Sequence, residues 1–227
     1  MKKNVVLRAL SALFVATAML TAQAAPVAGK DYVPINPPQP VETGDKIEVL
    51  EAFSYFCPHC YQFEPQLNTW MKTLPADVAV RKLPVTFNRD AWANLAKVYY
   101  TLEITGDLPK LNTKVFEALH GQKLNLGKPE VLFDWIAKQG VDQKKFSDNY
   151  NSFSVQTKVA RIPQLTQAYG VDSVPNIIVD GKYRVLSHGS YDEMFRVINE
   201  LIALARSQRP AKAAAATPSA TTKAAVK

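Results

Sequence analysis

Apolar residues follow one another without a polar face in one short run, KIEVLEAF at residues 46–53. A run of this length predicts a central β-strand that is covered on both faces. Between Cys57 and Pro75 the apolar positions recur at helical spacing, and residues 78–87 return to a strand pattern. Strand, helix and strand in this order predict a parallel pair of strands joined by a right-handed crossover.

Helical periodicity then runs through residues 90–170. It predicts an inserted lobe of five helices with its own small core, in which Asp90 caps the first helix and Pro163 interrupts the last. Strand patterns resume at NIIVDGKYRVLS, where Asp180-Gly181 predicts a two-residue hairpin turn. An S-x-x-E capping box then opens a last amphipathic helix. The chain is therefore expected to be an α/β protein with a helical insertion.

Both ends of the chain differ from the part between them. Residues 1–24 combine a basic start, an apolar stretch and the small-x-small ending Ala22-Gln23-Ala24, which predicts a cleaved secretory signal peptide. The alternative, an uncleaved membrane anchor, is disfavoured because the apolar run is shorter than the ~20 residues of a spanning helix. Residues 207–227 contain mainly Ala, Thr, Pro and Lys and are expected to form a disordered tail.

The net charge belongs to these ends. Of the formal +7, three positive charges lie in residues 1–24 and four in residues 207–227, with no acid in either segment. Residues 25–206 are therefore neutral overall. Nucleic-acid binding, which the basic ends would suggest, loses its main support, and we expect no nucleic-acid partner.

The chain has two cysteines, Cys57 and Cys60, in the stretch SYFCPHCYQF. As a structural disulfide they would stabilise little, because the closed loop would be very short. Structural zinc needs four ligands, which the pair and three scattered histidines supply poorly, and haem attachment needs a histidine where Tyr61 stands. A redox pair fits best, with a structural or metal role as the alternative.

The expected location of the pair explains how it would react. Cys57 would lie at the start of the helix, where free N–H groups and the positive end of the helix dipole stabilise a thiolate and lower its pKa. Pro58 suits the first helical turn, and His59 adds a donor or a positive charge beside the same sulfur. Cys57 is therefore expected to be the exposed sulfur that forms mixed disulfides with clients, and Cys60 the buried resolving thiol.

A stabilised Cys57 thiolate favours the dithiol over the disulfide. Each pKa unit is worth ~1.4 kcal/mol, or ~30 mV for a two-electron couple. A depression of several units therefore predicts a disulfide that readily takes electrons, which is the property of a disulfide donor. No metal or organic cofactor is implied.

The motif FSYFCPHCYQFEP, together with the helical insertion, closely resembles the DsbA family of periplasmic thiol:disulfide oxidants of Gram-negative bacteria. The resemblance implies a thioredoxin fold, with residues 25–89 and 171–206 as the thioredoxin-fold domain and residues 90–170 as an inserted helical domain. DsbA is itself a standard example of a low-pKa cysteine and of a strongly oxidising disulfide, so the expected direction is not independent of the resemblance. The Ala/Thr/Lys tail departs from the family pattern.

The same resemblance implies roles for four further residues. SVPNI matches the cis-proline loop of thioredoxin folds, which places Pro175 opposite the cysteines and lets the Val174 backbone pair with an extended client segment. An ordinary trans proline is the alternative. Glu51 and Lys82 match a buried acid and its partner beneath the active site, where they would relay a proton for Cys60. The residues alone favour an ordinary strand-end pair that faces water.

These inferences predict a monomeric, soluble periplasmic oxidase that donates the Cys57–Cys60 disulfide to newly exported, unfolded proteins with free cysteines. The resemblance implies that a membrane quinone-linked partner of the DsbB type reoxidises it. A disulfide isomerase or reductase of the same fold is one alternative, although isomerases of this compartment usually carry an added dimerisation domain. A non-catalytic binding module or chaperone with a structural disulfide is the other.

Overall fold

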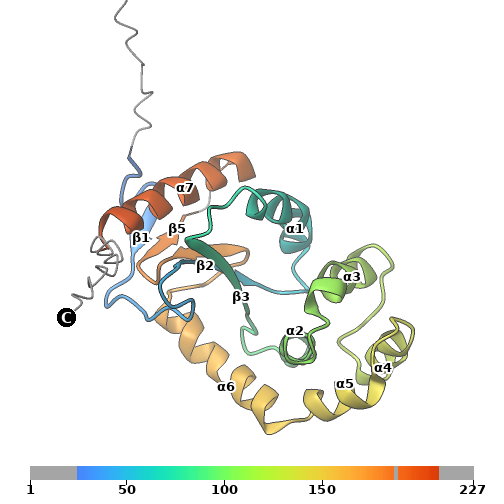
Figure 1. The fold of residues 1–227 in the computed structure, drawn as a ribbon. Coiled ribbons are helices and arrows are strands. Elements are labelled where there is room, and N and C mark those ends of the chain that lie inside the picture. Colours follow the sequence, from blue (N-terminus) through green and yellow to red (C-terminus); the bar gives the residue numbers. More distant parts are fainter. Residues whose placement is uncertain (1–24, 187–188, 210–227) are drawn as a thin grey trace, which may run out of the picture.

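A five-stranded mixed sheet forms the centre of the molecule (Figure 1). The computed structural model describes residues 25–186 and 189–209, so the expected signal peptide and most of the expected tail lie outside the described residues. The strand order is β1-β5-β4-β2-β3. The strands are β1 (Tyr32–Pro34), β2 (Ile47–Phe53), β3 (Val78–Pro84), β4 (Asn176–Val179) and β5 (Tyr183–Val185).

Strand β2 is the central strand that the apolar run predicts, because every one of its residues is buried. It pairs in parallel with β3, as predicted, and antiparallel with β4. Strand β3 ends at Pro84, before the predicted end at Phe87. Phe87 and Asn88 have positive φ angles of 43° and 57°, which an extended strand does not contain.

The other edge of the sheet differs from the prediction in two ways. Strand β1, which the apolar pattern does not indicate, pairs antiparallel with β5. In the β4–β5 hairpin, Asp180 and Gly181 have the expected positive φ angles of 53° and 64°. Residues 180–182 separate the paired Val179 and Tyr183, so the connection is one residue longer than predicted.

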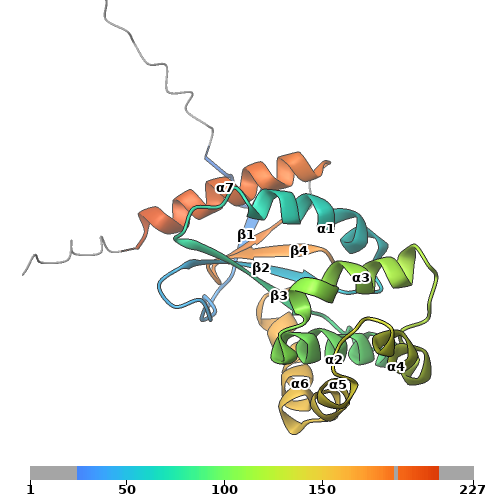
Figure 2. The ribbon, with the colours of Figure 1, turned by 45° about the vertical axis from the view of Figure 1, so that its right-hand side comes forward.

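Helices lie on both sides of the sheet (Figure 2). On one side are α1 and α7, and on the other is the lobe of five helices that stands between β3 and β4 in the chain. The helices are α1 (Pro58–Met71), α2 (Asp90–Thr105), α3 (Leu108–His120), α4 (Pro129–Ala137), α5 (Gln143–Tyr150), α6 (Phe153–Ala168) and α7 (Tyr191–Ser207). Ser190 caps α7 as predicted, since its hydroxyl accepts a hydrogen bond from the Glu193 N–H at 3.2 Å.

The lobe departs from the sequence prediction in three respects. Asp90 is the first residue of α2 and does not cap it; Arg89 holds the N-cap position without a side-chain hydrogen bond. Helix α6 continues through Pro163 instead of being interrupted there. The lobe has no separate core, because its buried residues form one hydrophobic cluster with Phe53 of the sheet and with both cysteines. The redox pair therefore packs against the inserted lobe.

The first three residues of the predicted tail, 207–209, belong to the fold. Ser207 is the last residue of α7. The Tyr183 hydroxyl donates a hydrogen bond to Gln208 Oε1 at 2.8 Å, and the Arg209 guanidinium contacts the Asp180 carboxylate at 2.5 Å. These contacts attach residues 208 and 209 to the β4–β5 hairpin.

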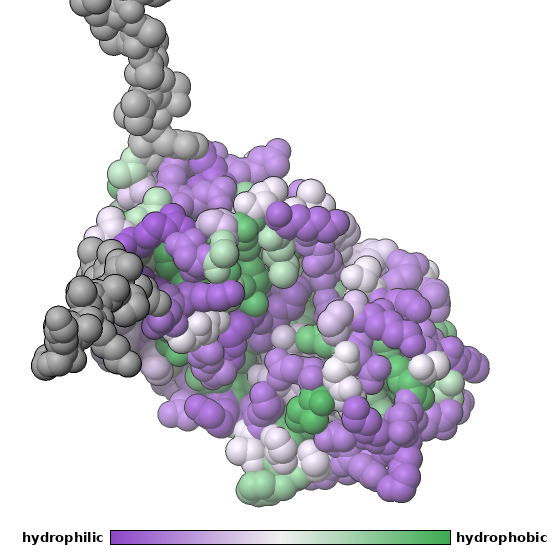
Figure 3. All heavy atoms as spheres, viewed as in Figure 1, coloured by the Kyte–Doolittle hydropathy of each residue, from purple (hydrophilic) through white to green (hydrophobic). Residues whose placement is uncertain are grey.

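The surface view in Figure 3 shows mainly hydrophilic residues, with hydrophobic residues in separate patches between them. In the part of the chain that the structure describes, no helix has both the length and the apolar character that a membrane span requires.

Candidate active site

Cys57 occupies the N-cap of α1, just after the carboxyl end of β2. Its backbone is extended, with φ −82° and ψ 118°, and Pro58 follows as the first helical residue. The Cys57 sulfur accepts a hydrogen bond from the Cys60 backbone N–H, with 3.4 Å between nitrogen and sulfur. The sulfur therefore faces the free N–H groups of the helix start, as the sequence predicts.

The two sulfurs differ in their affinity for a proton. Hydrogen bonds from the Cys60 thiol and from the backbone N–H groups of Cys60 and His59, with the charge of His59, outweigh burial and lower the pKa of Cys57 to about 6. Burial, the hydrogen bond with Cys57 and the charge of Glu51 raise the pKa of Cys60 far above that of a free thiol. At neutral pH, Cys57 is therefore mainly a thiolate, whereas Cys60 keeps its proton.

Cys57 is less exposed than the sequence predicts, with 7% of its surface accessible against 0% for Cys60. The loop before β4 accounts for part of this burial, because the Val174 carbonyl oxygen lies 3.3 Å from the Cys57 sulfur and accepts a hydrogen bond from it when Cys57 is protonated. Cys57 is still the outer sulfur of the pair. The burial of Cys57 reflects its contact with this loop. The family resemblance implies that clients bind to the same segment.

The loop that faces Cys57 ends in a cis peptide bond between Val174 and Pro175. Asn176 comes next and begins β4, which lies antiparallel to β2. Because β2 and β4 are neighbours in the sheet, they bring Val174 beside Cys57 although 117 positions separate the two residues. Pro175 therefore lies on the side of the cysteine pair where the resemblance places it.

Pro58 and His59 form the exposed first turn of α1. The Tyr191 hydroxyl donates a hydrogen bond to the His59 carbonyl oxygen at 3.3 Å, which joins the start of α1 to the start of α7. The His59 backbone is thus held through its carbonyl oxygen.

A buried charged cluster lies beneath the cysteines. The Glu51 side chain is 0% exposed and that of Lys82 11%, so the interpretation of this pair as a surface pair facing water is wrong. Lys82 Nζ lies 2.7 Å from Glu51 Oε2 and 2.5 Å from Glu64 Oε2. Burial opposes the charge of Lys82, but the two carboxylates outweigh it and raise the pKa of Lys82.

Glu51 differs from Glu64 in its hydrogen bonding. The contact of Glu51 with Lys82 has the distance of an ion pair without the alignment of a hydrogen bond, and neither Glu51 oxygen has a hydrogen-bond partner among the described residues. Burial raises the pKa of Glu51, although Lys82 acts in the opposite direction. A buried carboxyl group in this environment is stabilised by holding a proton, and its charge acts on Cys60. Glu51 is thus suited to exchange a proton with the resolving thiol.

Within residues 25–186 and 189–209, no three His, Cys, Asp or Glu side chains come together as a set of metal ligands.

Comparisons with known proteins identify the family of the chain. The DSBA-like thioredoxin domain family matches residues 48–197. The thiol:disulfide interchange protein DsbA of Bordetella parapertussis is 40% identical over 210 residues, which cover 91% of this chain and 100% of that protein. The protein of the same name from Pseudomonas aeruginosa PAO1 is 38% identical over 202 residues, 88% of this chain and 95% of that protein. The chain belongs to the DsbA family.

Solved structures of DsbA proteins share its fold. The crystal structure of Pseudomonas aeruginosa DsbA matches with a TM-score of 0.75 at 40% identity and covers 80% of this chain and 95% of that chain. The oxidoreductase DsbA from Xylella fastidiosa matches with a TM-score of 0.75 at 28% identity, and the match covers 81% of this chain and 100% of that chain. The protein is therefore a thioredoxin-fold thiol:disulfide oxidoreductase, as its CPHC motif predicts.

Sequence reasoning missed two residues that contact the buried cluster of this DsbA protein. Glu64 lies four residues after Cys60, on the buried face of α1 with Phe63 and Leu67. A charged residue on the apolar face of a predicted helix was an available signal for it. Asn112 of α3 offered no such signal, because its contact with Glu64 joins positions 48 residues apart.

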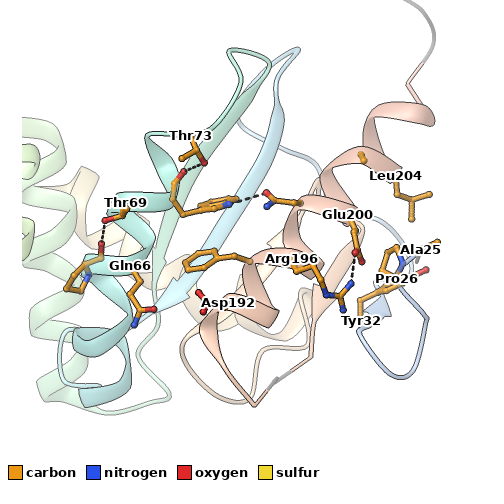
Figure 4. Close-up of a pocket in the computed structure, with 15 residues that line it drawn as sticks. Ala25, Pro26, Tyr32, Gln66, Thr69, Thr73, Asp192, Arg196, Glu200 and Leu204 are labelled. Carbon is orange, nitrogen blue, oxygen red and sulfur yellow. Dashed lines mark hydrogen bonds and ion pairs between the residues drawn. The ribbon is translucent and has the colours of Figure 1, made fainter. Parts of the chain in front are cut away.

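A large cavity of this DsbA protein lies elsewhere, between α1 and α7 (Figure 4). Its volume is about 1210 Å³. The rings of Trp70 and Phe195 stack at 5.3 Å on its wall, and Trp70 Nε1 donates a hydrogen bond to Asn199 Oδ1 at 3.1 Å. Neither cysteine, nor any residue of the buried charged cluster, lines this cavity, so it is separate from the redox site.

Proposed function

We propose that this protein is a periplasmic dithiol oxidase, which transfers its Cys57–Cys60 disulfide to newly exported, unfolded proteins with free cysteines. The observation that carries the proposal is the Cys57 sulfur at the start of α1, with a pKa of about 6, beside a Cys60 whose pKa is raised. A stabilised Cys57 thiolate stabilises the reduced protein and leaves the disulfide form ready to take electrons. The names of its relatives support the exchange chemistry.

Transfer begins when a client thiolate attacks the Cys57 sulfur of the oxidised protein. The Cys57–Cys60 bond breaks, a mixed disulfide forms between Cys57 and the client, and Cys60 leaves as a thiolate. Because Cys60 is buried and its pKa is raised, this thiolate takes up a proton. Glu51 is the buried acid that donates it.

Release follows when a second client thiolate attacks the client sulfur of the mixed disulfide. The client disulfide forms and Cys57 leaves as a thiolate, which its low pKa makes a good leaving group. Two electrons have then moved from the client to the cysteine pair. Of the two client protons, one replaces the proton that Glu51 gave to Cys60, and the other remains in solvent.

The loop before β4 holds the client during this exchange. The Val174 carbonyl oxygen lies 3.3 Å from the Cys57 sulfur. An extended client segment that pairs with the Val174 backbone would therefore present its cysteine to Cys57, with Pro175 fixing the edge of the binding site. The active form is a monomer, and a membrane quinone-linked partner of the DsbB type accepts the two electrons and restores the disulfide. The scheme uses no metal or organic cofactor.

Equilibration with glutathione tests the direction of transfer. The reduced fraction of the protein is measured over a range of ratios of glutathione to glutathione disulfide. We expect a reduction potential well above the roughly −270 mV of thioredoxin. A value near that of thioredoxin would overturn the oxidase proposal in favour of a reductase.

Two serine variants separate an oxidase from a non-catalytic binding module. Cys57→Ser removes the attacked sulfur, so we expect it to lose all exchange activity with a reduced client protein. Cys60→Ser is the matched control, because it keeps Cys57 and should hold a client in a stable mixed disulfide. A Cys57→Ser protein with undiminished effect on client folding would point to a chaperone instead.

A further inference from the structure

Tyr191 of α7 reaches the first turn of α1, beside the redox pair. It is the first residue of α7 and directly follows the Ser190 cap. Its hydroxyl donates a hydrogen bond to the His59 carbonyl oxygen at 3.3 Å. Its ring packs on that of Phe63, one turn further along α1, with 5.0 Å between the ring centroids. The start of α7 is therefore fixed against the start of α1.

The carbonyl group that Tyr191 contacts belongs to the same peptide unit as the N–H that bonds to Cys57. The peptide bond between His59 and Cys60 joins the His59 carbonyl to the Cys60 nitrogen, and this nitrogen lies 3.4 Å from the Cys57 sulfur. The bond is trans, so its C=O and its N–H point in opposite directions. Two hydrogen bonds in series thus lead from the Tyr191 hydroxyl, through one peptide unit, to the Cys57 sulfur.

Hydrogen bonds in series strengthen one another. A donor at the carbonyl oxygen polarises the peptide unit and makes its N–H a stronger donor. The gain is larger for a thiolate than for a thiol or a disulfide, because hydrogen bonds to an ionised acceptor are about twice as strong as neutral ones. The Cys60 thiol is the largest cause of the low pKa of Cys57, and the Cys60 N–H is the first of the backbone donors that add to it. Tyr191 acts on this backbone donor.

We propose that Tyr191 is a positioning residue for disulfide exchange, which holds and polarises the peptide between His59 and Cys60 so that its N–H binds the Cys57 sulfur more strongly. The proposal rests on the proposed function and deepens it, because it adds a residue that sets how readily the disulfide takes electrons. The described hydrogen bond of Tyr191 goes to the peptide and not to a sulfur, so Tyr191 acts through that peptide.

Removal of the Tyr191 hydroxyl leaves the charges around Cys57 as they are. The titratable groups that face Cys57 are His59 and Cys60 of α1, Glu51 of β2 and Tyr191 of α7. The loop before β4 contributes only the Val174 backbone. Burial and the two sulfurs raise the pKa of Tyr191, so its hydroxyl is a neutral donor between pH 4 and 8. Tyr191→Phe therefore changes a hydrogen bond without changing a charge.

Titration of the thiolate absorbance in the reduced proteins is the first measurement. Tyr191→Phe removes the donor to the peptide, so the Cys60 N–H binds the thiolate less strongly and the Cys57 midpoint rises. Cooperative strengthening of about 10–30% of a hydrogen bond to a charged group corresponds to roughly 0.3 pKa unit. We therefore expect an acid dissociation constant of Cys57 about twofold lower in the variant than in the wild type.

Equilibration with glutathione at two pH values is the second measurement. At pH 8 Cys57 is a thiolate in both reduced proteins, so the variant should be about twofold less oxidising, or roughly 9 mV lower in reduction potential. At pH 5 Cys57 is mainly protonated in both, so their potentials should agree. A loss of packing at the start of α7 would act at both pH values alike.

Replacement of Tyr191 by 3-fluorotyrosine gives the opposite sign. The fluorine withdraws electrons from the hydroxyl and makes it a stronger donor, so the Cys57 midpoint should fall below that of the wild type. The titration runs from pH 4 to 7, where the phenol keeps its proton. Tyr61→Phe is the matched control, because it also removes a hydroxyl that bonds α1 to another helix, here to Glu117 of α3 at 2.7 Å. Its Cys57 midpoint should equal that of the wild type.

An unchanged Cys57 midpoint in Tyr191→Phe overturns the proposal, as does a rise of the midpoint in both Tyr191 variants. A change in potential that is the same at pH 5 and at pH 8 also overturns it, because lost packing then explains the effect. The wild-type titration keeps these results apart from the proposed function. A wild-type midpoint like that of a free thiol would contradict the oxidase proposal, whereas a low wild-type midpoint that Tyr191→Phe leaves unchanged contradicts the role of Tyr191 alone.

Discussion

The low pKa of Cys57 has a measurable consequence for the stability of the protein. The folded state lowers the pKa to about 6, whereas the unfolded chain has the ~8.5 of a free thiol. For a group whose folded pKa is depressed, the stabilisation is fully present above the unfolded value and is lost as pH falls through the folded value. The reduced protein should therefore lose stability, relative to the oxidised protein, as pH falls from 8 to 4.

The size of the effect follows from the two pKa values. Between them, each pH unit is worth about 1.4 kcal/mol. Cys60 keeps its proton in the folded state and begins to lose it only in the unfolded chain near pH 8, which subtracts a few tenths of a kcal/mol. The free energy of unfolding of the reduced protein, minus that of the oxidised protein, should thus fall by about 2.5 kcal/mol from pH 8 to pH 4.

Guanidinium unfolding of both redox forms at a series of pH values measures this difference, because groups that titrate alike in the two forms cancel. Reduced Cys60→Ser is the control that retains Cys57. Its free energy of unfolding, minus that of reduced Cys57→Ser, should fall by the same amount from pH 8 to pH 4. A difference that stays constant within ~0.5 kcal/mol from pH 8 to pH 4 would refute the argument, since a thiolate stabilised at the helix start must lose that stabilisation when it is protonated.

Three further changes have expected outcomes. His59→Ala should raise the pKa of Cys57 and make the disulfide less oxidising, by less than the backbone hydrogen bonds contribute, because the His59 charge is the weakest cause of the shift; thiolate absorbance against pH measures it. Lys82→Met should lower the free energy of unfolding by about 3–5 kcal/mol, because it leaves buried carboxylates without their cation; an unchanged guanidinium midpoint at constant slope would contradict this. Ser190→Ala should cost about 1 kcal/mol through the lost cap of α7, with Ser190→Thr as the control that keeps a hydroxyl.

Together these tests separate three levels of the molecule. The Cys57 and His59 experiments test the stabilisation of the thiolate at the helix start, the Lys82 experiment tests the stability of the buried charged cluster, and the Ser190 experiment tests a helix cap outside the site. An effect of Ser190→Ala on the redox potential would be unexpected, because the described contacts of its side chain lie within the first turn of α7.

The sequence by itself determined the features that depend on neighbouring residues. The strand–CPHC–helix order places Cys57 at an N-cap, and the two-residue spacing places Cys60 within the first turn. Short-range rules also identify the all-buried strand β2 and the cap at Ser190. For the two helix starts the deciding interaction lies within a few residues of the chain, and for β2 the unbroken apolar run is itself the signal of burial, so composition and spacing contain the information.

Only the tertiary structure decided which distant residues meet the redox pair. The burial of Cys57 depends on Val174, 117 positions away, and the burial of the Glu51–Lys82 pair depends on α1 packing over the sheet. The three-residue strand β1 likewise exists through its pairing with β5. Local propensity does not predict such distant partners. An acid such as Glu51 is a surface group or a buried proton carrier according to what packs against it.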